Sequence, residues 1–156
     1  MSPASLQAGG EAPSFCLPDH TDEEVCLSDL KGDKALIYFY PRASTPGCTV
    51  QSCSVRDARG QLASLGVKVL GISPDSPKAQ KKFSEKYGLD FPLLSDPDHA
   101  VATAYGVWRE KLMYGKKYFG IIRSSFLIDE EGKILQAWYK VSPKDTVPEA
   151  LKALSG

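Results

Sequence analysis

The chain has 156 residues, of which 42% are hydrophobic and 24% are charged, a balance that is typical of a globular domain and excludes a disordered or fibrous chain. Its 19 Lys and Arg residues equal its 19 Asp and Glu residues in number, so the sequence lacks the basic excess that binding to nucleic acid requires. We therefore expect a single domain over residues 1–156 and no nucleic-acid partner.

The apolar segments of the chain are short. The longest one, residues 35–40, is far below the ~20 residues that a membrane-spanning helix needs. The first 12 residues are small, polar and rich in Gly and Pro, which does not resemble a secretion signal. These features predict a cytoplasmic protein that has no membrane partner.

Short apolar runs, apolar residues at helical spacing and turn residues between them predict a series of strands and helices. The expected strands are 15–17 and 24–27 as a hairpin, 35–40, 67–73 and 91–94, and 123–128 with 133–139 as a second hairpin. The expected helices are 48–65, 76–87, 98–105 and 146–154, the last with Thr146 as its N-cap. Residues 106–122 show no clear period and are expected to form an ordered connection of low regularity.

The order of these elements indicates the fold class. Strands alternate with helices in the first half, and an antiparallel hairpin with a final helix follows. This order predicts an α/β protein of thioredoxin-like type, a three-layer α/β/α sandwich with a central mixed sheet and an N-terminal β-hairpin. Residues 35–40 are apolar throughout, which favours a central strand that is covered on both faces.

Cys48 has the position that most strongly suggests chemistry. It follows the central strand and a Pro46-Gly47 step, at the start of a predicted helix, where open α/β sheets bind their ligands. The partial positive charge and free N–H groups of a helix N-terminus favour a thiolate. The N–H groups of Gly47 and Cys48 can also hold an anionic oxygen there. A buried thiol without a function is the alternative, and the nearby hydroxyl of Thr45 favours the nucleophile.

Cys53 follows Cys48 by five residues on the same predicted helix. On an ideal helix the two Cα atoms would be about 8.7 Å apart, which is beyond the ~7 Å limit for a disulfide. A bond between them therefore requires the first helical turns to unwind, which costs little at a helix end. Simple core packing of Cys53 remains the alternative.

The segment PRASTPGCT resembles the P-x-x-x-T-x-x-C motif of peroxiredoxins. The cysteine five residues farther on and the segments VLGISPDS, KYGLDFPLLSD and RSSFLID resemble the Q branch of that family, also called bacterioferritin comigratory proteins. The resemblance extends from about Ala12 to the last helix. It implies a monomeric thiol peroxidase that needs no cofactor or metal and reduces hydrogen peroxide and organic hydroperoxides with electrons from thioredoxin or a similar dithiol.

The resemblance also implies roles for individual residues. Cys48 corresponds to the peroxidatic cysteine, which is oxidised to a sulfenic acid, and Cys53 to the resolving cysteine, which condenses with it to a disulfide. Thr45 corresponds to the hydroxyl that binds the thiolate and the peroxide, and Pro41 to the residue that keeps water away. Arg123 corresponds to the guanidinium that stabilises the negative charge on sulfur and on the peroxide oxygens.

Three further residues do not belong to this set. Cys16 and Cys26 would face each other if the predicted hairpin turns at Thr21, and they would be able to pair under oxidation. Two small apolar side chains in a reduced core are the favoured interpretation. Gln51 lies one helical turn from Cys48, close enough to touch the active site, and has no assigned role.

Other classes of function fit the spacing less well. The spacing does not fit a metal site, because the chain has no C-x2-C pair and His20 and His99 are isolated from Cys48 and Cys53 in the sequence. Disulfide reductases use C-x-x-C, whereas this chain has C-x4-C. A Cys-His hydrolase would need a histidine as its base. A non-enzymatic redox sensor that uses the same cysteine pair as a switch remains the alternative.

Overall fold

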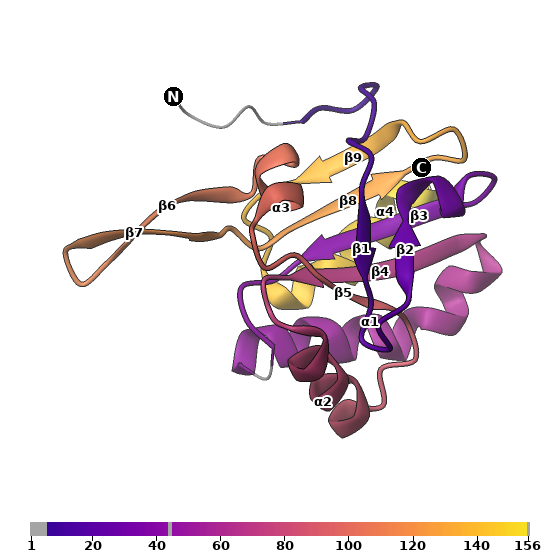
Figure 1. Ribbon diagram of the computed structural model, residues 1–156. Coiled ribbons are helices and arrows are strands. Elements are labelled where there is room, and N and C mark those ends of the chain that lie inside the picture. Colours follow the sequence, from indigo (N-terminus) through magenta and orange to yellow (C-terminus); the bar gives the residue numbers. More distant parts are fainter. Residues whose placement is uncertain (1–5, 44, 156) are drawn as a thin grey trace.

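The computed structural model describes residues 6–43 and 45–155, and its centre is a five-stranded mixed sheet (Figure 1). The strands lie in the order β5 (Leu93–Ser95), β4 (Val67–Ser73), β3 (Lys34–Phe39), β8 (Ser124–Ile128) and β9 (Ile134–Trp138). β3, β4 and β5 are parallel, while β8 is antiparallel to β3 and β9 is antiparallel to β8. The predicted central position of the apolar strand is confirmed, because β3 has two neighbours on each side.

The sheet is covered on both faces, which confirms the predicted three layers. One face carries α1 (Pro46–Ser64), α2 (Pro77–Tyr87) and α4 (Thr146–Ser155), and the other carries the N-terminal hairpin, the 3-10 helix η1 (Leu27–Leu30) and α3 (Ala100–Ala104). Successive side chains of β3 point to opposite faces. Tyr38 packs with Val55 on the face of α1, and Phe39 packs with Tyr105 on the other.

Local signals set the ends of the helices. The side chain of Ser76 accepts a hydrogen bond from the N–H of Ala79, and Gly88 closes α2 with a φ of 61°, as an N-cap and a glycine C-cap do. α1 starts two residues earlier than predicted, because Pro46 is compatible with a first helical position. In the described part of the chain, no helix has the length and apolar character needed to cross a membrane.

The start of α4 differs from the prediction. A short 3-10 helix, η2 (Pro143–Asp145), precedes α4 directly. Thr146 is therefore the first residue of α4 and has helical backbone angles, whereas an N-cap residue has extended ones. The predicted N-cap at Thr146 is wrong because the sequence pattern did not reveal the preceding turn.

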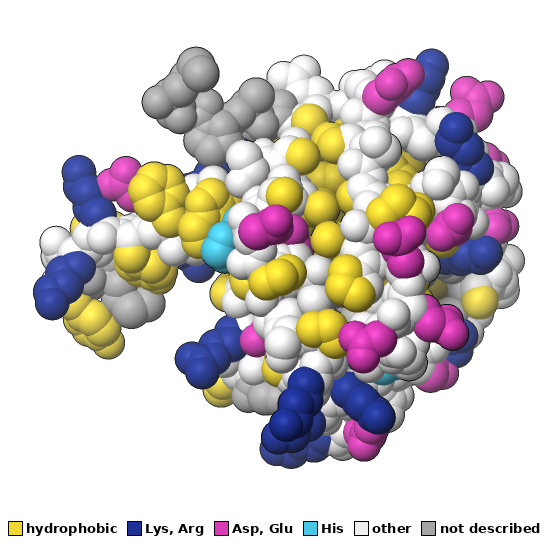
Figure 2. Space-filling view, viewed as in Figure 1, with side chains coloured by type: hydrophobic (Ala, Val, Ile, Leu, Met, Phe, Trp, Pro, Cys, Tyr) yellow, Lys and Arg dark blue, Asp and Glu magenta, His cyan; other side chains and the backbone are white. Residues whose placement is uncertain are grey.

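Residues 106–122 form a regular hairpin, so the prediction of an irregular connection is wrong. β6 (Trp108–Met113) pairs with β7 (Lys116–Ile121) across Tyr114 and Gly115, which both have positive φ, as a type I′ turn requires. The hairpin projects from the body (Figure 1) and exposes apolar and basic side chains together (Figure 2). Because most of its residues are exposed on both faces, the apolar-polar alternation that marks a half-buried strand is missing.

The N-terminal hairpin also forms, but its cysteines are not core thiols. β1 (Cys16–Pro18) pairs with β2 (Glu24–Cys26) so that Cys16 lies directly opposite Cys26, and a disulfide joins them. Leu17 and Val25, one position along, pack on the core, so the cysteines take the other face of the hairpin. Cys16 is exposed and Cys26 half-buried, which overturns the favoured interpretation of a reduced, buried pair.

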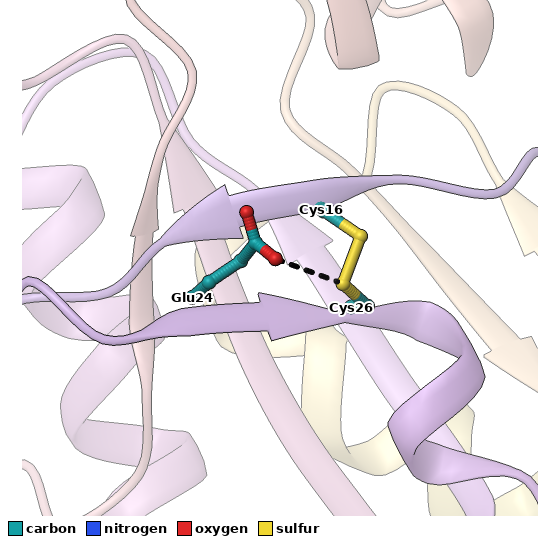
Figure 3. Close-up of side chains that lie close together, drawn as sticks. All are labelled: Cys16, Glu24 and Cys26. Carbon is teal, nitrogen blue, oxygen red and sulfur yellow. Dashed lines mark hydrogen bonds between the residues drawn. A yellow bond between two sulfur atoms is a disulfide. The ribbon is translucent and has the colours of Figure 1, made fainter.

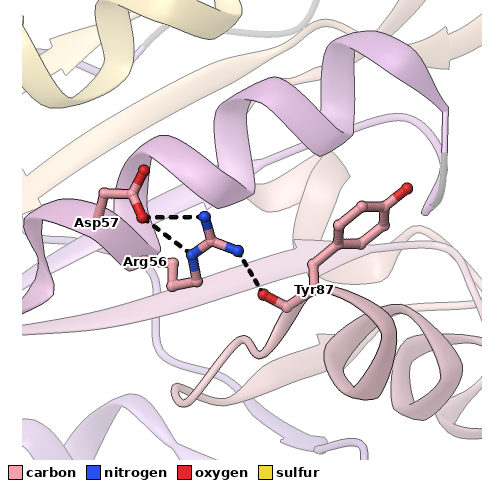
Figure 4. A network of polar contacts seen from close by, with 3 residues as sticks. All are labelled: Arg56, Asp57 and Tyr87. Atoms are coloured by element: carbon pink, nitrogen blue, oxygen red, sulfur yellow. Dashed lines mark hydrogen bonds and ion pairs between the residues drawn. The ribbon is translucent and has the colours of Figure 1, made fainter.

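α1 and α2 are fastened to each other by one arginine (Figure 4). Nη1 of Arg56, in α1, donates a hydrogen bond of 2.6 Å to the backbone carbonyl of Tyr87 at the end of α2. Its Nε and Nη2 both lie 3.0 Å from Asp57 Oδ1. This contact ties the middle of α1 to its neighbour, three residues after Cys53.

Candidate active site

Cys48 is the third residue of α1 and is fully buried. The N–H of Thr49 donates to the carbonyl of Thr45 at 2.8 Å. The N–H groups of Gly47 and Cys48 come before this bond, in the first turn, where a helix has no internal acceptors for them. The sulfur therefore lies at the positive end of the helix, as the sequence predicted.

Arg123 lies beside this sulfur. It stands between β7 and β8, and its Nη1 donates to Cys48 Sγ at 3.4 Å and to Gln51 Oε1 at 2.9 Å. The backbone carbonyl of Arg123 accepts from the N–H of Val141 at 2.9 Å. A side chain at Gly47 would displace the guanidinium, because a Cβ there would lie 2.9 Å from Arg123 Nη2. Gly47 thus leaves the room that the guanidinium occupies.

Gln51 holds the guanidinium in place. Its side chain is fully buried, accepts from Arg123 through Oε1 and donates through Nε2 to Thr146 Oγ1 at 2.9 Å. A buried amide needs both kinds of partner, and here they come from distant parts of the chain. The sequence placed Gln51 within one turn of Cys48, but it could not show these partners.

Lys111 is a second cation of this region that the sequence analysis missed. Its Nζ donates to the carbonyl of Ile121 at 2.7 Å, two residues before Arg123. The chain of Lys111 passes over Gly120, where a Cβ would lie 3.0 Å from its Cδ. The pKa of Lys111 lies below its usual value, because burial and the charge of Arg123 lower it more than the charge of Cys48 raises it. The Tyr114-Gly115 turn was the signal that would have revealed its hairpin.

Thr45 and Pro41 belong to the loop that leads into α1, and both are half-buried. The hydroxyl of Thr45 donates to the carbonyl of Arg42 at 2.8 Å. A hydroxyl has one hydrogen, so it must turn away from Arg42 before it can donate to the sulfur. The N–H of Ala43 donates to Asp75 Oδ2 at 2.7 Å, which anchors the loop to the turn that follows β4.

Cys53 lies on the second turn of α1, half-buried, and both it and Cys48 are free thiols. The buried hydroxyl of Tyr38 shares a hydrogen bond of 2.9 Å with Ser52, the residue before Cys53. Burial raises the pKa of Tyr38 far above its usual value, and the charges of the two cysteines raise it further. Tyr38 therefore stays a neutral phenol.

Cys16, Glu24 and Cys26 are the group in the described part of the chain whose ligand atoms are close enough for a metal ion, all within 4.8 Å of one another. The two sulfur atoms are bonded to each other, and a metal needs thiolates. His20 accepts from the N–H of Leu93 at 3.4 Å, and His99 stacks on Trp108 at 3.7 Å between ring centroids. These contacts give both histidines other partners.

The chain matches known proteins along most of its length. Residues 8–137 match the AhpC/TSA family. A "Putative peroxiredoxin bcp" of Haemophilus influenzae is 53% identical over 145 residues, which cover 93% of this chain and 92% of the relative. "Peroxiredoxin Bcp" of Escherichia coli is 55% identical over 129 residues, 83% of each chain.

A solved structure shares the fold. It is the bacterioferritin comigratory protein of Xanthomonas campestris, which was solved to explain its alkyl peroxide reduction activity, and it is 39% identical to this chain. The TM-score is 0.88, and the similarity covers 95% of this chain and 97% of that one. The predicted thioredoxin-like fold and the resemblance to the Q branch are both confirmed.

Proposed function

Because this chain belongs to the AhpC/TSA family and is a peroxiredoxin, we propose that Cys48 reduces hydroperoxides, that Cys53 resolves the product and that a thioredoxin-type dithiol restores both thiols. The contact between Arg123 Nη1 and the buried Cys48 Sγ at 3.4 Å is the observation that carries the proposal. A guanidinium that donates to a sulfur at a helix N-terminus stabilises the thiolate, which is the nucleophilic form.

In the first step the Cys48 thiolate attacks the terminal oxygen of the hydroperoxide. An S–O bond forms and the O–O bond breaks, so sulfur loses two electrons and the other oxygen leaves as water or an alcohol once protonated. Arg123 and the first N–H groups of α1 lie where negative charge develops. Their positions are set by Gln51 and Gly47, so little reorganisation is needed during the reaction.

In the second step the thiolate of Cys53 attacks the sulfenic sulfur of Cys48 and displaces hydroxide, which forms a disulfide. Both residues lie on α1, so the first turns of this helix must unwind. The bond between Arg56 and Tyr87 holds α1 from residue 56 onward, which confines the unwinding to the two turns that carry the cysteines. Unwinding also exposes the buried Cys48 to an external dithiol.

A relative and the site support the substrate class that we propose. The alkyl peroxide reduction of the Xanthomonas protein supports organic hydroperoxides beside hydrogen peroxide as substrates. Pro41 follows the last residues of β3, and we propose that it keeps water from the sulfur, while Thr45 turns from Arg42 to bind the peroxide. The protein is proposed to act as a monomer.

Turnover tests this function. With thioredoxin, its reductase and NADPH, the native protein should consume many equivalents of hydrogen peroxide, and the Cys48→Ser variant should consume none above background. The Cys53→Ser variant should take up one oxygen atom at Cys48, visible by intact mass, without forming the intramolecular disulfide. Consumption that stops after one equivalent of peroxide per protein would favour a redox sensor over an enzyme. Activity retained in Cys48→Ser would refute the role of Cys48.

A further inference from the structure

We propose that Cys16 and Cys26 form a second, reversible dithiol–disulfide couple that works independently of Cys48 and Cys53. Three observations support it: the place of the pair in the fold, its exposure, and the bonds that hold the hairpin around it. None of them depends on the peroxidase activity.

The two cysteine pairs lie on opposite sides of the central sheet. Leu17 and Val25 of the hairpin pack on the cluster that contains Phe39, whereas Cys48 belongs to the cluster on the other face, with Tyr38. The sheet therefore separates the pairs. Cys16 is exposed, so a thiolate from solution can reach its sulfur without any movement of the fold.

The hairpin is closed without the help of its disulfide. On the turn side, the N–H of Asp19 donates to the carbonyl of Glu23 at 2.8 Å, and Asp19 Oδ1 accepts from the N–H groups of Thr21 and Glu23. On the other side, the N–H of Leu27 donates to the carbonyl of Phe15 at 3.0 Å. After reduction these bonds keep the two thiols opposite each other, and a high effective concentration favours closing the bond again.

Glu24 sets the electrostatics of the pair (Figure 3). Its Oε1 lies 3.8 Å from Cys26 Sγ, and its place two residues before Cys26 puts both side chains on one face of the strand. In the reduced state the Cys26 thiol can donate its hydrogen to this carboxylate. The negative charge disfavours a thiolate at Cys26 and repels an incoming thiolate, so Glu24 slows both opening and exchange of the disulfide.

The chemistry is a two-electron exchange with a dithiol. A thiolate of the reductant attacks Cys16 Sγ, the S–S bond breaks, and Cys26 leaves as a thiolate that takes up a proton. The second thiol of the reductant then attacks the mixed disulfide and releases Cys16. The reductant ends as a disulfide and the protein as a dithiol, and an oxidised dithiol reverses both steps.

The Cys48→Ser, Cys53→Ser double variant isolates the couple, since Cys16 and Cys26 are then the remaining cysteines of the chain. The variant is equilibrated in buffers of reduced and oxidised dithiothreitol and alkylated with N-ethylmaleimide, and its intact mass is measured. We expect a transition from zero to two alkylated thiols, with the same midpoint from either direction and an unchanged circular dichroism spectrum. A pair that stays oxidised until the protein unfolds, or that never closes again, would overturn the proposal.

A variant of the neighbouring carboxylate tests the role of Glu24. Glu24→Gln in the same double variant should be reduced by dithiothreitol several-fold faster. The matched control is Glu23→Gln, which removes an exposed carboxylate of the turn and should leave the rate unchanged. Equal rates for the two variants would overturn the role of Glu24, even if the couple itself is reversible.

Discussion

The two cysteine pairs of this protein show how geometry decides which sulfur atoms are bonded in the resting fold. Cys48 and Cys53 are five residues apart on one helix and are free, whereas Cys16 and Cys26 are ten residues apart on facing strands and are joined. A helix turns residues five apart to different directions, but an antiparallel register places partners face to face. Closeness along the chain is therefore a poor guide to pairing.

The surroundings of the two pairs differ as much as their geometry. Cys48 is buried and receives a hydrogen bond from a guanidinium, while Cys26 lies 3.8 Å from a carboxylate. The first environment favours an anionic, nucleophilic sulfur and the second a neutral one. In line with this contrast, we propose peroxide chemistry for the helix pair and thiol–disulfide exchange for the hairpin pair, and each of the following variants tests that division.

The largest effect is expected at Arg123. Arg123→Ala removes the donor to Cys48 Sγ, so kcat/KM for hydrogen peroxide should fall by about 10²-fold. Arg123→Lys keeps the charge but loses the planar guanidinium, which also bonds Gln51. Its kcat/KM should lie between those of the native protein and Arg123→Ala. Reduction of the Cys16–Cys26 disulfide should proceed at the native rate in both. An unchanged kcat/KM in Arg123→Ala would contradict the comparison.

A smaller loss is expected from Gly47→Ala. The new Cβ would lie 2.9 Å from Arg123 Nη2 and must displace the guanidinium, which should slow peroxide reduction roughly tenfold, about 1.4 kcal/mol. Gly60→Ala, on the same helix, is the matched control, because a Cβ at Gly60 would have no neighbouring atom within 4 Å outside the nearby backbone of the helix itself. It should keep full activity. It should also stabilise the fold by about 0.5–1 kcal/mol, which raises the melting temperature slightly. Equal activity of both variants would show that Arg123 tolerates displacement.

Lys111→Met should have a milder effect. The cation lies close enough to Cys48 and Arg123 for their charges to alter its pKa, so its loss should lower the alkylation rate of Cys48 by iodoacetamide at neutral pH by roughly two- to fivefold. Added salt should shrink the difference. Lys117→Met, on the same hairpin, removes an exposed lysine that pairs with Glu110 at 3.7 Å and should change nothing. The same rate in both variants would exclude Lys111 from the site.

The smallest effect on turnover is expected from replacing Cys16 and Cys26 together by Ser. Peroxide reduction should stay at the native level, since the sheet separates the pairs. Loss of the cross-link increases the conformational entropy of the unfolded chain, which should cost about 2–3 kcal/mol of stability. Calorimetry should therefore show a melting temperature lower by roughly 5–10 °C. A lowered kcat/KM would show that the pairs are coupled.

Much of the fold could be predicted because it follows from local patterns. The central strand is an unbroken apolar run, and α1 and α2 each begin with Pro and have Gly just after their ends. The β6–β7 hairpin was missed for a physical reason. Few of its residues are buried, so no period in its apolar residues reports the strands, and only its two-residue turn does.

The sequence by itself determined the order of elements, the place of Cys48 at a helix start and, through a family motif, the identity of Arg123 as its partner. Only the tertiary structure decided that Gln51 joins Arg123 to Thr146. It alone also decided that Lys111 of the β6–β7 hairpin bonds the carbonyl of Ile121 near Arg123, and that Cys16 is bonded to Cys26. Periodicity records whether a residue is buried, which is a local property. These contacts depend instead on how segments far apart in the chain, or facing strands in register, are brought together.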